Sequence, residues 1–174
     1  KVAGIAANNA SGMCCGTAQN SYQTVQSMRV ILADGTLLDT SDEASRAAFA
    51  VSHRPMLERL AAMAERTCAD VELAARIRRK FAIKNTTGYS LNALTDFTDP
   101  FEILQHLMIG SEGTLGFIGS ITYRTVPEYA DKASALMMFS DIGTACRAVI
   151  AMKPTPVSAV ELIDRASLRS IESK

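Results

Sequence analysis

The sequence predicts an α+β fold, because strand patterns and helical patterns both recur along its 174 residues. Residues 25–40 read as a β-hairpin, and residues 41–81 carry an alanine-rich helical pattern. A further helix near residue 100 leads through a glycine-rich loop into another strand. The length is sufficient for one large domain, or for one domain and part of a second, with a real hydrophobic core.

The first regular element expected is the hairpin. Val25 to Leu32 is rich in β-branched and apolar residues, Asp34-Gly35 is a strong signal for a tight turn, and Thr36 to Thr40 forms the returning strand. A helical stretch from Ser41 to about Phe81 follows, and Pro55 divides it. The basic run at 76–80 indicates solvated helix surface rather than a binding patch.

The next pair of elements is a helix and a strand joined by glycines. Pro100 is expected to begin the helix and Gly110 to end it. The helix should place Phe101, Leu104, Leu107 and Met108 on one face. The strand is expected over Phe117 to Val126, before Pro127, with Phe117, Ile121 and Tyr123 on one face.

A domain boundary is expected after Pro127, so that residues 1–127 and 128–174 belong to different domains. Beyond it, Ala135 to Phe139 and Val157 to Ile163 have the composition of buried strands. Helices should follow each of them, the second one capped by Asp164. The first of these helices is marked by apolar residues at helical spacing, namely Ile142, Ala145, Cys146, Val149 and Ile150.

Composition excludes several classes of function. Eighteen Lys and Arg balance eighteen Asp and Glu, and no basic block stands out, so nucleic acid is not an expected partner. No apolar run approaches the roughly 20 residues of a membrane span. Cys14, Cys15, Cys68 and Cys146 form no C-x-x-C pair, so neither a metal site nor a disulfide is expected. Reduced thiols favour a cytoplasmic location, with peripheral association with a membrane as the alternative.

Three glycines at equal spacing, Gly110, Gly113 and Gly116, suggest close approach of the backbone to a ligand. A Walker loop is excluded because Phe117 and Ile118 stand where lysine and a hydroxyl are needed. A Rossmann fingerprint is excluded because the order is helix, loop, strand. What remains is a loop whose amides form a small concavity, or an ordinary helix cap, and spacing alone favours neither.

The stretch from Gly4 to Gly12 offers a second surface of this kind. Its side chains are nearly all very small, so backbone donors could come within hydrogen-bond range of a flat or charged ligand. A close-packed turn or a helix N-terminus would explain the same composition. Two such stretches in one chain favour a bulky nucleotide cofactor more than either does alone.

Four motifs in order resemble those of a known family. They are G-x-x-A-x-N-A-S-G at 4–12, VILADGTLLDT at 30–40, NTTGY at 85–89 and GSEGTLGFI at 110–118. This order is similar to that of flavoproteins of the vanillyl-alcohol oxidase type with a PCMH-type FAD-binding domain, in the branch of D-lactate, glycolate and D-2-hydroxyglutarate dehydrogenases. The chain departs from the pattern at Ala3, where a glycine is common.

The resemblance implies a fold and a cofactor, FAD. Residues 1–127 would be the second lobe of the FAD-binding domain, a mainly antiparallel sheet with flanking helices, and 128–174 the beginning of an α+β cap domain. The first lobe would precede Lys1, so we expect the chain to be part of a longer protein and to retain little FAD alone. The residues implied to line FAD are Gly4, Ala6, Ala7, Asn9, Ala10, Ser11, Gly12, Gly110, Ser111, Glu112, Gly113, Thr114, Gly116 and the backbone of Ile118.

The implied reaction is oxidation of a D-2-hydroxy acid by hydride transfer to the flavin. No catalytic residue is assigned in this chain, because the family draws its base and carboxylate anchor largely from the cap domain. Lys84 is the one cation considered near the flavin edge, although a solvated loop lysine is favoured. His53 and His106 match no flavin-attachment motif, so FAD should be held non-covalently.

Partners and rival functions are less defined by the sequence. The electron acceptor is unassigned, a quinone or a fused iron–sulfur module being the candidates, and a homo-oligomer is compatible with the chain. The rival functions are a nucleotide-binding module without redox chemistry and an FAD enzyme of the same fold with different chemistry.

Overall fold

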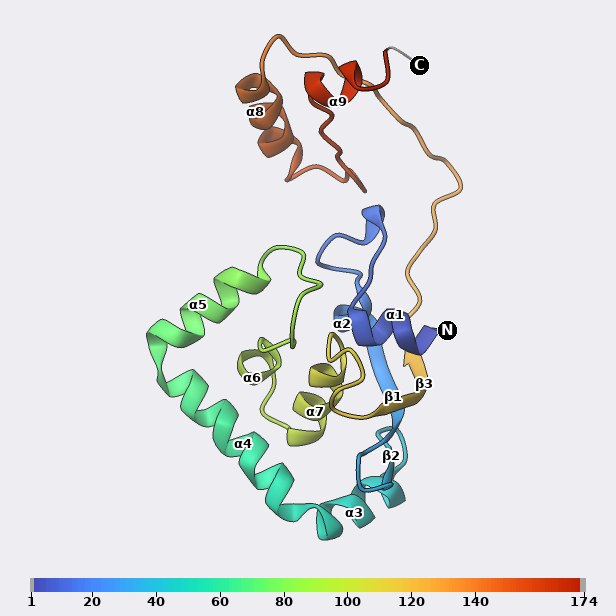
Figure 1. Cartoon of the computed structure of the whole chain (residues 1–174), viewed down its shortest axis with the longest axis vertical. Helices are drawn as coiled ribbons and strands as arrows, with labels where there is room; N and C mark the ends of the chain where they lie inside the picture. The colour runs from blue at the N-terminus through green and yellow to red at the C-terminus, as the bar shows by residue number, and fades with distance from the viewer. Residues whose placement is uncertain (1, 173–174) are drawn as a thin grey trace. The chain divides into compact units, whose positions relative to one another are not determined.

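Residues 2–172 are described by the computed structural model (Figure 1), and they divide into two units. One unit holds residues 2–12 and 16–126, and the other holds residues 13–15 and 127–172. The first unit contains α1 (Val2–Asn8), α2 (Ser21–Thr24), β1 (Val25–Ile31), β2 (Leu37–Asp39), α3 (Glu43–Ser52), α4 (Arg54–Ala69), α5 (Val71–Phe81), α6 (Ala93–Asp96), α7 (Pro100–Met108) and β3 (Phe117–Tyr123). The second contains η1 (Met13–Cys15), α8 (Ile142–Met152) and α9 (Arg165–Arg169).

The strands of the first unit form an antiparallel sheet in the order β2-β1-β3. The predicted hairpin is confirmed, with Asp34 and Gly35 at its turn and Gly35 at φ +84°. The Asp34 carboxylate accepts a hydrogen bond from the Thr36 amide at 2.9 Å. This bond is the largest cause that lowers the pKa of Asp34 to about 2, and a hydrogen bond with His53 adds to it. The chain therefore has an α+β fold.

Two bulges shift the pairing of β1 with β3. Arg29 lies opposite Ser120 and Val30 opposite Ile118, so Gly119 is the extra residue on β3. A bulge changes which side chains face the core beyond it. Ile118 is therefore buried, whereas Phe117 is 66 % exposed. The prediction that Phe117 shares the core face with Ile121 and Tyr123 is wrong for this reason.

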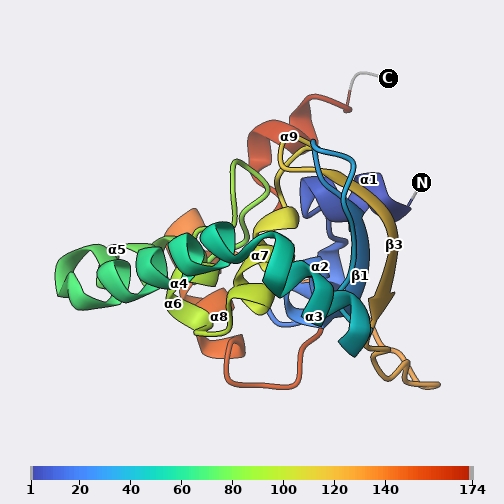
Figure 2. The same cartoon turned by 90° about the horizontal axis from the view of Figure 1, so that it is seen from below.

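Helices cover one face of this sheet, and α4 and α7 lie to one side of β1 and β3 in Figure 2. The predicted helix at Pro100 is confirmed, with Asp99 capping it and Gly110 just beyond its end at φ +85°. Its buried side chains include Ile103, Leu104 and Met108. The core is completed by Met28 and Val30 of β1, Leu38 of β2 and Phe49 of α3.

The predicted helical stretch at 41–81 consists of three helices. Pro55 lies in the first turn of α4, as expected, and a second break occurs at Asp70. The Asp70 side chain accepts a hydrogen bond from the Leu73 amide at 3.0 Å and so caps α5. The break at Asp70 was not predicted, because the apolar pattern continues across it.

An aromatic cluster lies under α7. The His106 ring stacks on Phe97 with 4.0 Å between centroids and meets Tyr22 edge-on at 4.8 Å. The Tyr22 hydroxyl donates to Asp96 at 2.8 Å. Burial, and then the Asp96 carboxylate, raise the pKa of Tyr22, so its hydroxyl stays protonated.

The second unit contains helices without a sheet. The helices predicted near 142–150 and after Asp164 are confirmed as α8 and α9. The strands predicted at 135–139 and 157–163 are wrong, because neither segment pairs with another strand within the described residues. A strand depends on a neighbour for its hydrogen bonds, and apolar composition alone does not supply one.

Gly116 provides the first prediction. A Cβ at this position would lie 2.9 Å from the Ile31 carbonyl oxygen and 3.3 Å from Met108 Cε. Gly116→Ala should therefore lower the free energy of unfolding by about 1–3 kcal/mol, measured by denaturant titration. Gly119→Ala is the matched control, because its nearest neighbour, the Arg29 carbonyl oxygen, would be 3.6 Å away. Equal destabilisation by the two changes would contradict the packing described.

His106 provides a prediction on pH. Burial lowers the pKa of His106 below its usual 6.5, so the unfolded chain binds a proton that the folded chain rejects. The folded state should lose stability as pH falls below about 6.5, by at most about 1.4 kcal/mol per pH unit. His106→Phe should flatten this dependence between pH 7 and 5 in denaturant titrations. An unchanged slope in the variant would show that His106 is not the group responsible.

Candidate functional site

The two stretches of small residues meet in the structure, although about a hundred positions separate them. The Gly110 amide donates to the Ala6 carbonyl oxygen at 3.2 Å, and the Glu112 amide donates to the Ala7 carbonyl oxygen at 2.9 Å. These bonds join the last turn of α1 to the loop between α7 and β3. The two stretches that the resemblance places against one cofactor therefore lie side by side in this unit.

A third segment, residues 83–92, completes this junction. Asn9 Nδ2 donates to the Asn85 carbonyl oxygen at 3.0 Å, in a buried bond. Lys84 Nζ donates to the carbonyl oxygens of Ser11 at 3.0 Å and Gly12 at 2.7 Å. Lys84 is thus not a free loop lysine. It connects the third segment to the first through these two hydrogen bonds.

The first stretch is helical up to Asn8 rather than an open loop throughout. The amides of Asn9 and Ala10 donate to the carbonyl oxygens of Ala6 and Ile5, both at 2.9 Å. These two amides are therefore not available to a ligand. The expectation that small residues leave the backbone donors of this stretch open is wrong for Asn9 and Ala10. What α1 presents instead is one exposed position without a side chain, Gly4, where a Cβ would have no neighbour within 4 Å.

The glycine row has more than one cause. At Gly110, where φ is +85°, a Cβ would lie 3.0 Å from the Gly88 carbonyl oxygen, and at Gly116 it would meet Ile31. Close protein backbone therefore accounts for these two glycines without a ligand. Gly113 has φ +77° and no neighbour within 4 Å of a Cβ, so its absent side chain serves the turn and leaves open space above it.

The amides of this loop are also largely occupied. Besides Gly110 and Glu112, the amides of Ser111 and Thr114 donate to the carbonyl oxygens of Met108 at 3.3 Å and Ser111 at 3.0 Å. The expected concavity of free amides is therefore wrong for these four positions. The Thr114 hydroxyl lies 2.8 Å from that of Tyr89 and donates to the Ser111 carbonyl oxygen at 2.6 Å.

The remaining predicted residues fall into two groups. Ala6 is fully buried, and Ile118 packs in the core with its backbone paired opposite Val30. By contrast, Gly12 and Glu112 are exposed, and Ala7, Ala10 and Ser11 are half-buried. The exposed and half-buried residues offer surface that a ligand can reach without a change in the fold.

Side-chain oxygens supply polar groups that the backbone does not. The buried oxygens without a hydrogen-bond partner among the described residues are Asn9 Oδ1, Ser11 Oγ, Ser111 Oγ and Asn92 Oδ1. Buried polar atoms are nearly always paired, so these oxygens call for a partner such as a bound water or a ligand group. Three of them belong to residues that the sequence had predicted for the cofactor, and the residues present therefore fit such a group.

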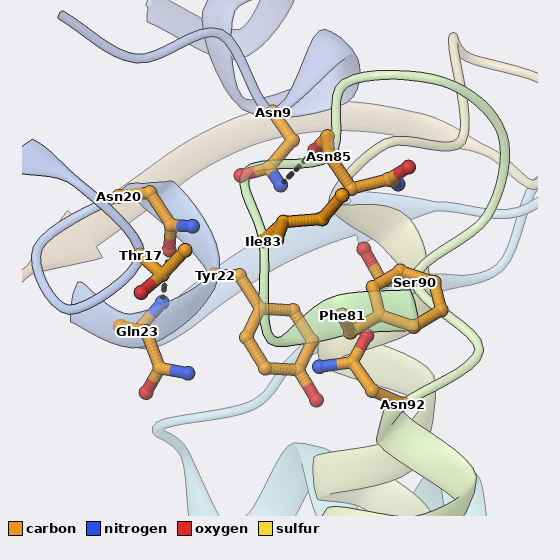
Figure 3. Close-up of a pocket in the computed structure, with 10 residues that line it drawn as sticks. All are labelled: Asn9, Thr17, Asn20, Tyr22, Gln23, Phe81, Ile83, Asn85, Ser90 and Asn92. Carbon is orange, nitrogen blue, oxygen red and sulfur yellow. Dashed lines mark hydrogen bonds between the residues drawn. The ribbon is translucent and has the colours of Figure 1, made fainter. Parts of the chain in front are cut away.

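A polar hollow lies beside this junction (Figure 3). Its lining includes amide side chains from three segments and the rings of Tyr22 and Phe81. The complete lining is Asn9, Thr17, Asn20, Tyr22, Gln23, Phe81, Ile83, Asn85, Ser90 and Asn92. Of these, only Asn9 was predicted as a site residue, and Asn85 belonged to a recognised motif. Asn92, close to that motif, was a further polar signal, and no local pattern marked the others.

Residues 1–41 match a family model described as "FAD binding domain". The match covers the first stretch, η1 and the hairpin, and it indicates FAD as the cofactor. No curated protein and no solved structure matches the chain. The match spans 41 of 174 residues and contains the first, but not the second, of the two stretches joined at the junction.

Other kinds of site find little support in the described residues. Within residues 2–172, no group of three or more His, Cys, Asp or Glu side chains could hold a metal ion. In the same part of the chain, no helix has the length and apolar character needed to cross a bilayer. His53 stacks on Phe49 and hydrogen-bonds to Asp34, and His106 is a buried residue of α7 that stacks on Phe97.

Gly4 provides a prediction that separates ligand contact from folding. A change at Gly113 would not make this distinction. Gly113→Val would strain a turn at φ +77°, so a loss of FAD binding in that variant could come from the altered turn as well as from a blocked contact. Gly4→Leu adds bulk on an exposed helix face and improves helix propensity, so the fold should be retained. It should nevertheless weaken FAD binding about tenfold or more, measured by flavin fluorescence titration.

The matched control for this prediction is Ala75→Leu, which adds a leucine at an exposed position of α5. It should leave FAD affinity unchanged. Undiminished FAD binding by Gly4→Leu would remove α1 from the cofactor site.

Proposed function

We propose that this chain forms part of the FAD site of a dehydrogenase that oxidises a D-2-hydroxy acid. The observation that carries the proposal is the junction itself, because the segment that matches the FAD binding domain is hydrogen-bonded to the GSEGTLG loop. The order of the motifs supports D-lactate, glycolate or D-2-hydroxyglutarate as the substrate. FAD supplies the acceptor for the substrate hydride when it is bound.

The role of this chain in that reaction is to bind and orient the cofactor. The low bulk of α1 and the open space at Gly113 allow close approach of a large planar molecule. The unpaired oxygens of Asn9, Ser11 and Ser111 can accept hydrogen bonds from its hydroxyl or N–H groups. The Asn9 oxygen is a poor partner for phosphate, since both sides of that contact would be acceptors, whereas the hydroxyls of Ser11 and Ser111 can also donate to one.

The Lys84 contacts hold the loop at 83–92 against the end of the first stretch. Positioning of this kind lets rigid backbone, rather than mobile side chains, set the distance between the segments that meet the cofactor. We propose that the general base for the substrate hydroxyl and the cation that binds the substrate carboxylate come from outside residues 1–174.

The proposal predicts a yellow protein whose colour responds to substrate. The protein expressed from its complete gene should release its flavin into the supernatant on acid precipitation, because no attachment residue is assigned. Under anaerobic conditions, one of D-lactate, glycolate or D-2-hydroxyglutarate should bleach the flavin absorbance, and a dye acceptor should then sustain turnover.

L-Lactate and L-2-hydroxyglutarate are the controls and should leave the flavin oxidised. Flavin that none of the three acids bleaches would leave the FAD site intact and refute the substrate class. A colourless protein that takes up no added FAD would refute the flavoenzyme and favour a nucleotide-binding module.

A further inference from the structure

The C-terminal half of α5 and the loop after it carry positive charge that no nearby acid balances. Residues 73–95 contain five cations and no Asp or Glu, in a chain whose formal net charge is zero. One of the five, Lys84, is bonded to the carbonyl oxygens of Ser11 and Gly12. The other four are exposed and form no ion pair with another described residue, namely Arg76, Arg78, Arg79 and Lys80.

Three of these cations lie together on the outward face of α5, which is at the edge of its unit, away from the sheet (Figure 2). The helix buries Ala74 and Ile77 against the protein. Arg79 and Lys80 follow Arg76 by three and four residues, so the three side chains are neighbours away from the buried side. Like charges at this spacing destabilise a helix. The helix dipole offsets this cost for cations in the last turn, but Arg76 lies before that turn.

Exposed aliphatic side chains accompany the cations. Leu73 precedes Arg76 by one helical turn and is 41 % exposed, and Ile83, just beyond the helix, is 64 % exposed. The only aromatic residue of α5, Phe81, is half-buried. Aromatic anchors contribute much of the binding energy at protein–protein interfaces, so this face has little to offer a specific protein partner. A lipid surface requires cations and some aliphatic surface, without an exact register.

We propose that the outward face of α5 is a docking surface for the headgroups of an anionic lipid membrane. Charge complementarity carries the proposal, since Arg76, Arg79 and Lys80 can pair with lipid phosphates, and each arginine can offer two parallel N–H groups to one phosphate. The apolar side of α5 is buried in the protein, so the helix would lie on the membrane without entering it. The expectation that the run at 76–80 is solvated surface only is revised here, because the fold gathers three of its cations on one face.

Vesicle sedimentation tests the proposal on the protein expressed from its complete gene. Vesicles of phosphatidylcholine with about 30 % phosphatidylglycerol should be bound on the order of 100-fold more tightly than phosphatidylcholine alone, since each cation near an anionic surface contributes about fivefold. Raising the salt concentration from about 50 mM to about 200 mM should reduce this preference several-fold, because salt screens exposed charges.

A triple variant, Arg76→Gln with Arg79→Gln and Lys80→Gln, should lose most of this preference. Glutamine has nearly the same helix propensity as arginine and lysine, so the unfolding temperature should change little. A second variant, Arg76→Lys with Arg79→Lys, retains the charges and should bind anionic vesicles within a few-fold of the wild-type protein.

The matched control removes three exposed arginines of the neighbouring helix α4, where Glu58 and Glu65 balance part of the charge. It replaces Arg54, Arg59 and Arg66 by glutamine, so its net charge equals that of the triple variant of α5. This control should keep the preference for anionic vesicles.

Several results would overturn the proposal. They are equal binding to the two kinds of vesicle, an equal loss of the preference in the α4 control, and an undiminished preference in the triple variant of α5. Binding to immobilised polyglutamate or to duplex DNA without binding to vesicles would also overturn it, in favour of an acidic protein or a nucleic acid. These measurements use neither substrate nor added FAD, so such results would leave the proposed function intact.

Discussion

The arrangement of the first unit depends on two backbone hydrogen bonds, from the amides of Gly110 and Glu112 to the carbonyl oxygens of Ala6 and Ala7. The bond to Ala7 satisfies an acceptor at the end of α1, where a helix leaves its last carbonyl groups without internal partners, and the bond to Ala6 gives a second donor to a carbonyl that already accepts from the Asn9 amide. The same bonds fix the loop that follows α7 on the end of α1. Tight packing at Gly110, whose Cβ would lie 3.0 Å from the Gly88 carbonyl oxygen, brings in the loop of residues 83–92. The segments at 4–12, 83–92 and 110–116, far apart in the sequence, thus meet around Gly110.

This junction combines satisfied backbone with unsatisfied side chains. The loop amides of Gly110, Ser111, Glu112 and Thr114 are paired within the protein, so these four do not need a ligand to complete their hydrogen bonds. The unpaired atoms are oxygens of Asn9, Ser11, Ser111 and Asn92, and hydrogen bonds from the amide nitrogens hold the two asparagine side chains in place. Unpaired buried oxygens lower the free energy of unfolding relative to a fully paired junction, but they are already positioned to form hydrogen bonds with a bound molecule. That balance is expected of a binding site and not of a purely structural junction.

Local patterns predicted most of the elements, and long-range contacts explain the errors. The hairpin at Asp34-Gly35 and the helix α7 follow from turn, capping and apolar patterns. The exposure of Phe117 depends on an extra residue, Gly119, which is visible only in the register with β1. The spacing of Gly110, Gly113 and Gly116 predicted close approach to a ligand, but two of these glycines serve close backbone contacts that no local pattern shows. The asparagines of the hollow were missed because residues from separate segments become neighbours only in the fold.

The central claim is that the joined segments form the surface that meets FAD, and hydrogen–deuterium exchange tests it directly. Amide exchange would be compared between the apoprotein and the FAD complex of the protein from its complete gene. FAD should slow exchange in residues 4–12, 83–92 and 110–114 together, because one ligand covers a surface that all three build. Residues 71–81 of α5, which line the hollow only through Phe81, should exchange nearly unchanged. Saturating FAD that leaves exchange in all three segments unaltered, or that protects α5 instead, would contradict the account.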